Sequence, residues 1–171
     1  KRFDESAILS RNQFISQLKS IEEDIREISH DLSREKDEVN NNFVGIFNNL
    51  IEQQENISEA KVTCSISREI HWDKIENNIK INLYRILQES LQNINKYAKA
   101  ENIDIEITKI NDNLVTTISD NGVGFQVAKK SKGIGLKNII SRTQACNGSV
   151  EIKSEIEKGT TIKIDIPNSK A

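Results

Sequence analysis

The spacing of apolar residues changes near Lys61, and this change constrains the fold more than any other feature of the sequence. Upstream, apolar residues recur at alternating steps of three and four, a pattern typical of a narrow seam between packed helices. They are Leu18, Ile21, Ile25, Ile28 and Leu32. Downstream, several segments alternate apolar and polar residues with period two, as strands do. We therefore expect a helical first part and a sheet-containing second part.

A second helix is predicted after a turn between about residues 36 and 42, where three asparagines are consecutive. Its broad apolar face comprises Phe43, Val44, Ile46, Phe47, Leu50 and Ile51. Two such helices form a hairpin that is too thin to bury its own apolar face. We therefore expect a homodimer in which two hairpins form a four-helix bundle. This assigns residues 1–56 to a dimerisation unit, with its boundary near residues 54–60.

The second part, residues 57–171, is predicted to be an α/β sandwich with a mixed sheet, which makes the whole chain α+β. Period-two alternation predicts strands within residues 61–70, 102–110, 114–120, 149–156 and 160–166. Helical patterns cover about residues 79–98 and 136–146. Strands that carry two long helices on one face make an α/β sandwich.

Composition excludes several classes of protein. The formal net charge of −2 argues against a nucleic-acid binder, which usually carries a strong basic excess. Cys64 and Cys146 are too few for a disulfide framework, which favours a reducing cytoplasmic environment. The chain lacks methionine, so we expect a piece of a longer protein, whose sensor region and any membrane anchor would lie elsewhere.

One predicted helix, "INLYRILQESLQNINKYAK", carries chemically useful side chains on a single face. At about 100° per residue, Glu89, Asn93 and Lys96 cluster opposite the apolar side, with Tyr97 beside Asn93. Carboxylate and amide oxygens suit a hard cation, and an ammonium group suits a phosphate. Taken alone, the same face would also fit an ordinary solvated surface.

Two glycine pairs follow in the stretch "SDNGVGFQVAKKSKGIGLKN". Gly122 and Gly124 come directly after Asp120, which ends a predicted strand. An Asn-Gly step alone is more often a hairpin turn. Gly133 and Gly135 precede a predicted helix, whose exposed amides would favour a phosphate. Each motif is weak alone, but their order along the chain is specific.

This order resembles the nucleotide-binding domain that sensor histidine kinases share with gyrase, heat-shock chaperone ATPases and mismatch-repair ATPases. The resemblance covers roughly residues 61–167. "QESLQNINKYA" is similar to the N box of the kinases, and "DNGVGF" and "GIGLKN" are similar to their two glycine boxes. The resemblance implies that the chain binds ATP and Mg²⁺.

The resemblance also implies a role for individual residues. Asp120 would accept a hydrogen bond from the adenine amino group, with Thr160 near the same ring. Asn93, supported by Glu89, would hold Mg²⁺ against the phosphates. The remaining phosphate and lid contacts would come from Lys96, Tyr97, Gly122, Gly124, Gly133 and Gly135.

His30 indicates the type of reaction. The seam places Ile25 and Ile28 inward, so His30 should point outward, and Asp31 can accept a proton from its imidazole. "REISHDL" resembles the phosphoacceptor motif of the histidine-kinase subfamily typified by nitrate and membrane-fluidity sensors. That resemblance implies autophosphorylation of His30 by ATP and transfer to an aspartate on a response-regulator receiver domain.

Two other interpretations remain open at this point. The chain could be a degenerate dimeric scaffold that no longer transfers phosphate, or a related ATPase or serine kinase that uses no phosphohistidine. The kinase subfamily usually has glutamine or histidine where this chain has Glu35, so a phosphatase activity is not implied.

Overall fold

A computed structural model describes residues 42–127 and 134–168. The predicted seam helix, with His30 and Asp31, lies outside these described residues, and so does Gly133. The predictions made for those positions therefore stay predictions.

A five-stranded mixed sheet forms the centre of the described part, in the order β1-β2-β3-β5-β4. Strand β1 runs parallel to β2, and the other neighbours pair antiparallel. The strands are β1 (Lys61–Ile66), β2 (Asn102–Ile110), β3 (Asn113–Asp120), β4 (Ser149–Glu155) and β5 (Gly159–Pro167).

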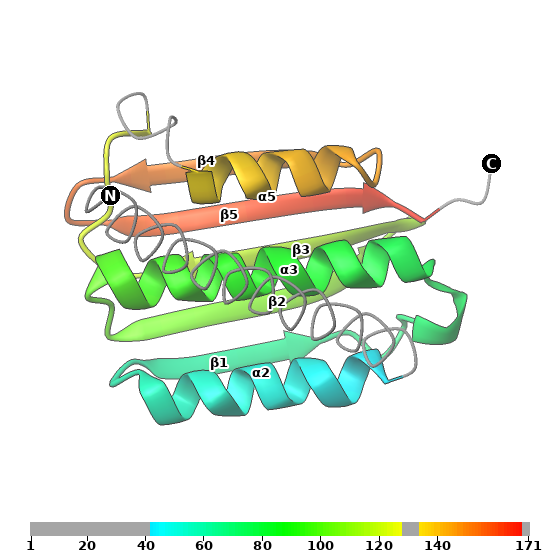
Figure 1. Ribbon diagram of the computed structural model, residues 1–171, viewed down its shortest axis with the longest axis horizontal. Helices are drawn as coiled ribbons and strands as arrows, with labels where there is room; N and C mark the ends of the chain where they lie inside the picture. The colour runs from blue at the N-terminus through cyan, green and yellow to red at the C-terminus, as the bar shows by residue number, and fades with distance from the viewer. Residues whose placement is uncertain (1–41, 128–133, 169–171) are drawn as a thin grey trace, which may run out of the picture. The chain divides into compact units, whose positions relative to one another are not determined.

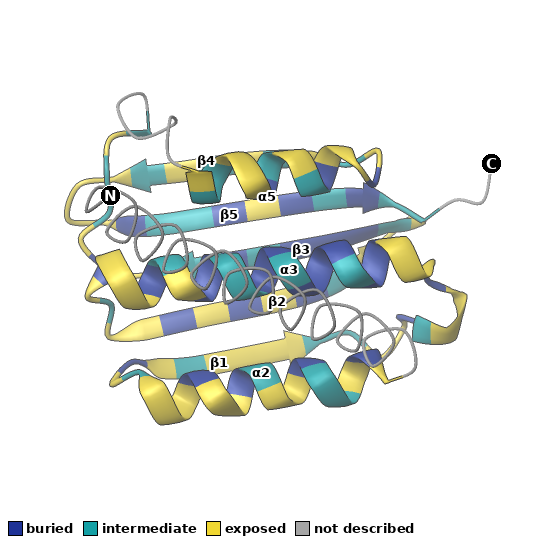
Figure 2. Ribbon diagram, viewed as in Figure 1, coloured by how far each residue is buried: buried dark blue, intermediate teal, exposed yellow. Residues whose placement is uncertain are grey.

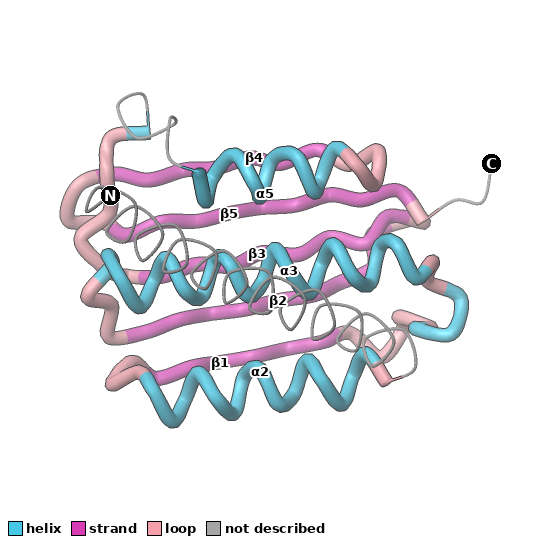
Figure 3. Tube along the Cα trace, in the orientation of Figure 1, coloured by secondary structure: helices cyan, strands magenta, loops and turns pink. Residues whose placement is uncertain are grey.

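In the part of the chain that the structure describes, helices cover one face of this sheet (Figures 1 and 3). Helix α3 packs between α2 and α5, while α2 also contacts β1 and α5 contacts β4 and β5. The helices are α2 (Phe43–Ile57), α3 (Asn77–Asn93) and α5 (Ile134–Gln144), and two short pieces are η1 (Trp72–Lys74) and η2 (Ile94–Ala98). The mixed sheet and both predicted helices of the second part are confirmed.

Alternation along the strands explains which face the helices cover. In β2 the side chains of Ile103, Ile105 and Ile107 are at most 2% exposed, while the residues between them face outward. Successive strand residues point to opposite faces, so these isoleucines lie against the helices. Figure 2 shows the same alternation of buried and exposed positions. The core therefore lies between the sheet and its helical layer.

Helix α2 forms where the sequence predicts a helix, but its apolar face is buried differently. Phe43, Phe47 and Ile51 are buried in the same core as the sheet and α3. The Phe43 ring lies 4.5 Å from the ring of Trp72, measured between centroids. Helix α2 packs against β1 and α3, and the domain boundary predicted near residues 54–60 stays a prediction. An amphipathic helix buries its apolar face against whichever surface adjoins it, and among the described residues that surface is formed by β1 and α3.

Within residues 42–127 and 134–168, no helix combines the length and the apolar character required to span a bilayer.

Candidate functional site

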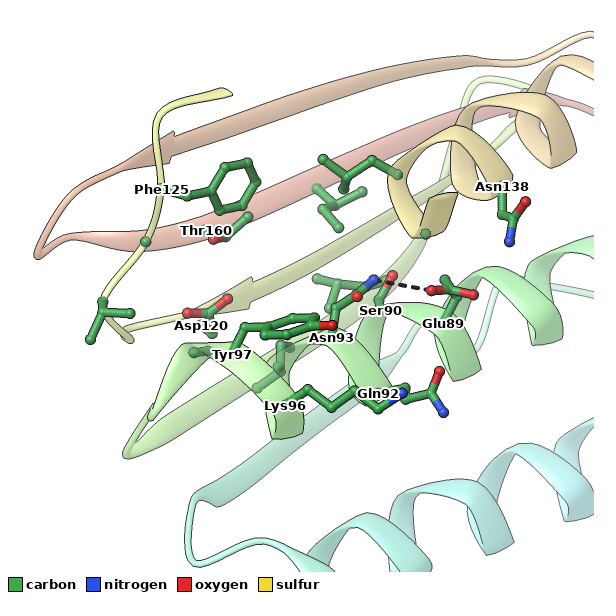
Figure 4. A pocket seen from close by; sticks show the side chains of 18 of the residues that line it. Glu89, Ser90, Gln92, Asn93, Lys96, Tyr97, Asp120, Phe125, Asn138 and Thr160 are labelled. Atoms are coloured by element: carbon green, nitrogen blue, oxygen red, sulfur yellow. Dashed lines mark hydrogen bonds between the residues drawn. The ribbon is translucent and has the colours of Figure 1, made fainter. Parts of the chain in front are cut away.

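A cavity of about 700 Å³ opens where the end of α3 and η2 face the loop after β3, the start of α5 and strand β5 (Figure 4). A volume of this size suits a small-molecule ligand. The predicted site residues that line it are Glu89, Asn93, Lys96, Tyr97, Asp120, Gly124, Gly135 and Thr160. Of the predicted site residues that the structure describes, only Gly122 is absent from this lining.

Asp120 marks one end of the cavity. It is the last residue of β3 and pairs in register with Thr160 on β5. The N–H of Gly122 donates to Asp120 Oδ1 at 2.9 Å. Burial raises the pKa of the Asp120 carboxyl, and hydrogen bonds from Gly122 and Thr160 partly oppose that rise. The carboxylate therefore lies in a partly desolvated place, where an added donor from a ligand would stabilise its charged form.

Apolar residues form the surface beside this carboxylate. Ile118 and Ile162 are buried and line the cavity, and Phe125 lines it from the loop after β3. A flat ring that carries an amino group would match this combination of apolar surface and acceptor. None of these three residues was predicted from the sequence to belong to the site, although Phe125 directly follows the first glycine pair.

Ser154 on β4 connects that loop to the start of β5, and sequence reasoning missed it as well. Its Oγ accepts from the Phe125 N–H at 2.8 Å and lies 3.0 Å from Thr160 Oγ1 and 3.0 Å from the Gly159 carbonyl oxygen. A serine in an alternating strand carries no sequence signal for such a role. This hydroxyl fixes Thr160 and Phe125 relative to each other.

Gly124 allows the sharp turn of the same loop. Its φ of +57° lies in the left-handed region, where a side chain is disfavoured. A Cβ atom there would also collide with the Glu155 carbonyl oxygen. The turn and the neighbouring Glu155 backbone therefore leave no space for a side chain at Gly124, and its role toward a ligand stays a prediction.

Glu89 and Asn93 mark the other end of the cavity. They lie one helical turn apart on α3, and Asn93 Nδ2 donates to Glu89 Oε1 at 3.3 Å. This orientation directs the amide nitrogen to the carboxylate and leaves the Asn93 amide oxygen as an acceptor for a hard cation. Gly135, at the start of α5, approaches so closely that a Cβ atom would contact Glu89 Oε1. Asn138 on α5 also lines the cavity and was missed from the sequence.

Lys96 and Tyr97 lie on η2, a π-helical turn that continues α3. The turn ends at Lys99, which has a φ of 50°. The Ala98 carbonyl accepts from the Val123 N–H at 2.7 Å, so the loop after Asp120 is attached to the end of the turn. The sequence predicts a regular α-helix here, because no residue pattern in this stretch signals a π-turn.

The arrangement suits a ligand with two chemically different ends. One end offers a carboxylate beside apolar surface, and the other offers oxygen donors and a lysine. Among the described residues, no group of three or more histidine, cysteine, aspartate or glutamate side chains is placed to hold a metal ion. A cation at Glu89 and Asn93 would therefore need further ligands from a bound anion or water.

Comparison with known proteins agrees with this geometry. A family model described as "Histidine kinase-, DNA gyrase B-, and HSP90-like ATPase" matches residues 78–170. The chain is 33% identical to the oxygen sensor histidine kinase NreB of Staphylococcus carnosus (strain TM300) over 96 residues, which make up 55% of the chain. It is 35% identical over 96 residues, or 56% of the chain, to the signal transduction histidine-protein kinase/phosphatase DegS of Brevibacillus brevis. The matched regions span only 28% and 25% of those two proteins.

Two solved structures share the fold. The histidine kinase AdeS of Acinetobacter baumannii superposes with a TM-score of 0.62 and 16% identity, covering 90% of this chain and 84% of that one. The histidine kinase domain of a blue-light activated histidine kinase from Erythrobacter litoralis EL346 gives a TM-score of 0.57 at 17% identity, covering 69% of this chain and 58% of that one. At these identities the likeness concerns the fold alone.

Proposed function

The chain belongs to the histidine kinase-, DNA gyrase B- and HSP90-like ATPase family, and from this premise we propose that it is the catalytic part of a dimeric sensor histidine kinase. It binds Mg·ATP in the cavity, phosphorylates His30, and passes the phosphoryl group to an aspartate of a response-regulator receiver domain. The observation that carries the proposal is that Asp120 and the Glu89–Asn93 pair line one cavity of about 700 Å³. Similarity to NreB and DegS supports the kinase assignment within the family.

Residues at one end of the cavity bind the adenine, and residues at the other end bind the phosphates. Asp120 accepts from the adenine amino group, and Thr160 adjoins the same ring. Asn93 and Glu89 would hold Mg²⁺, and the bound ion would supply neutralisation of charge on the phosphates. Lys96 and Tyr97 contact phosphate oxygens, and the glycines at 122, 124, 133 and 135 shape the lid. Positioning and charge neutralisation account for most of the catalysis in such a site.

The transfer itself replaces one bond by another. The bond between the γ-phosphorus and the β–γ bridging oxygen breaks, a phosphorus–nitrogen bond forms at the His30 ring, and ADP leaves. Asp31 accepts a hydrogen bond from the other ring nitrogen, which keeps the attacking nitrogen nucleophilic, and takes that proton as the phosphorus–nitrogen bond forms, so that the phosphorylated ring is neutral.

Labelling with γ-labelled ATP tests this function. In the presence of Mg²⁺ we expect the protein to acquire acid-labile label, as a phosphohistidine does. His30→Gln removes the acceptor and Asn93→Ala removes the metal ligand, so each should abolish the label. His71→Gln is the matched control, because His71 is the only other histidine and lies outside the cavity lining. It should label like the unaltered chain.

The contrary outcomes separate the alternatives. Label that survives in His30→Gln would instead indicate a serine kinase or another acceptor. An unaltered chain that binds Mg·ATP but acquires no label would indicate a dimeric scaffold.

A further inference from the structure

Two side-chain amides join helix α2 to the π-turn η2. Gln54 Nε2 donates to Asn95 Oδ1 at 2.6 Å, and Asn95 Nδ2 donates to Gln54 Oε1 at 2.8 Å. Gln54 is only 4% exposed, on the face of α2 that also carries the buried Phe47 and Ile51. A polar side chain is costly at such a position unless its donors and acceptors are satisfied. The reciprocal pairing satisfies Gln54 through a residue that lies 41 positions away.

The π-turn is the segment that brings Lys96 and Tyr97 into the cavity lining. Asn95 directly precedes these two residues. Directly after them, the Ala98 carbonyl accepts from the Val123 N–H at 2.7 Å. The pair of cavity residues is therefore fixed on both sides, by α2 before them and by the loop after β3 behind them.

A π-turn needs such support because it is rarer and less favourable than α-helix. It inserts one residue into the turn, so a return to α-helical register would rotate the side chains after the turn by about 100° and those within it by part of that angle. That rotation would carry Lys96 and Tyr97 away from their present directions. The bond to Ala98 alone fixes only the end of the turn, whereas the amide pair fixes its interior.

We propose that Gln54 and Asn95 are positioning residues whose paired amides hold η2 in the π conformation that directs Lys96 and Tyr97 at the phosphates of a bound nucleotide. The role rests on the proposed function, because it assigns the cavity to Mg·ATP. Neither Gln54 nor Asn95 lines the cavity, so both act through the turn.

The test compares a ligand with phosphates to one without. NMR titrations measure the affinity for a hydrolysis-resistant ATP analogue plus Mg²⁺ and, separately, for adenosine. They are made on the full unaltered chain and on the variants Gln54→Ala, Asn95→Ala and the double variant. Each single variant should bind the analogue about tenfold more weakly, because a small misplacement of contacting groups costs this much or more. Adenosine affinity should change by less than about twofold, since Asp120 and Thr160 are unaffected.

Two further readouts belong to the same experiment. The double variant should lose no more affinity than either single variant, because the amides act as one unit. Amide hydrogen exchange at residues 94–98 should be faster in all three variants. Gln53→Ala is the matched control, an exposed glutamine next to Gln54 on the same helix, and it should leave both affinities unchanged.

Three results would overturn the positioning role. They are an equal loss of affinity for the ATP analogue and for adenosine, a loss in the double variant that equals the sum of the two single losses, and an unchanged affinity of the single variants for the analogue. Asn95 is an exposed residue, so Asn95→Ala keeps the test valid even where Gln54→Ala unfolds the domain. If the unaltered chain binds neither ligand, the proposed function itself is contradicted. If the unaltered chain binds the analogue and the variants bind it equally well, only the positioning role is contradicted.

Discussion

Burial and hydrogen bonding act in opposite directions on the pKa of the Asp120 carboxyl. Burial raises its pKa, and the hydrogen bonds from Gly122 and Thr160 oppose the rise without cancelling it. A carboxyl whose pKa is higher in the folded chain than in the unfolded chain stabilises the fold most fully below the unfolded pKa. That stabilisation is lost as the pH rises through the folded pKa.

We therefore expect Asp120→Asn to have a higher free energy of unfolding than the unaltered chain at neutral pH. Asparagine is uncharged and avoids the cost of a desolvated carboxylate. The difference should shrink as the pH falls below the raised pKa, and urea denaturation of both proteins across this range measures it.

Added adenosine should lower the Asp120 pKa in a carboxyl NMR titration, because the adenine amino group would donate to the charged form.

A carboxyl pKa at or below the ordinary aspartate value, or one that adenosine leaves unchanged, would contradict this account of Asp120.

Most individual site residues were predictable from sequence, but their surroundings were not. Asp120, Asn93 and Glu89 stand in recognisable motifs, and the structure brings them to one cavity. Ser154 comes from β4, outside every recognised motif, and only the folded chain brings it near the site. The direction of the Asp120 pKa shift likewise depends on burial, which no local motif states.

At the scale of elements, helix α2 offers the clearest test. Phe47 is fully buried against the sheet domain, so Phe47→Ala should destabilise this domain by about 3–5 kcal/mol. Trp72 is the only tryptophan and its ring lies beside that of Phe43 on α2, so its fluorescence during chemical denaturation reports the loss. Val44 lies on the same helix and is 40% exposed, so Val44→Ala should change the free energy of unfolding by less than about 1 kcal/mol.

The opposite result would place α2 in a separate unit. In that case Phe47→Ala would leave the Trp72 transition unchanged and weaken dimerisation instead.

Sequence periodicity predicted the elements better than it predicted their partners. The alternation in β2 and β5 fixed which isoleucines face the helices, because strand side chains alternate strictly. The apolar stripe of α2 predicted a helix correctly, but such a stripe does not say what covers it. The π-turn η2 was missed, since its extra residue is held by contacts from Gln54 and Val123 rather than by local sequence.

At the scale of the whole molecule, the fold explains how distant motifs form one site. Pairing of β3 with β5 brings Asp120 beside Thr160, and packing of α5 on α3 brings Gly135 against Glu89 and Asn93. The resemblance to the ATPase family predicted this convergence, because the order of the motifs is specific. The helical segment upstream of residue 42 and its acceptor histidine remain predictions from sequence.

The most direct test of the central claim is a crystal structure of the chain with Mg²⁺ and a hydrolysis-resistant ATP analogue. We expect the adenine amino nitrogen about 3 Å from an Asp120 carboxylate oxygen. We also expect Mg²⁺ at about 2.1 Å from the Asn93 amide oxygen, against the phosphates of the same molecule. A nucleotide bound elsewhere, or one that contacts Asp120 while the metal lies away from Asn93, would contradict the claim that one cavity holds both ends of ATP.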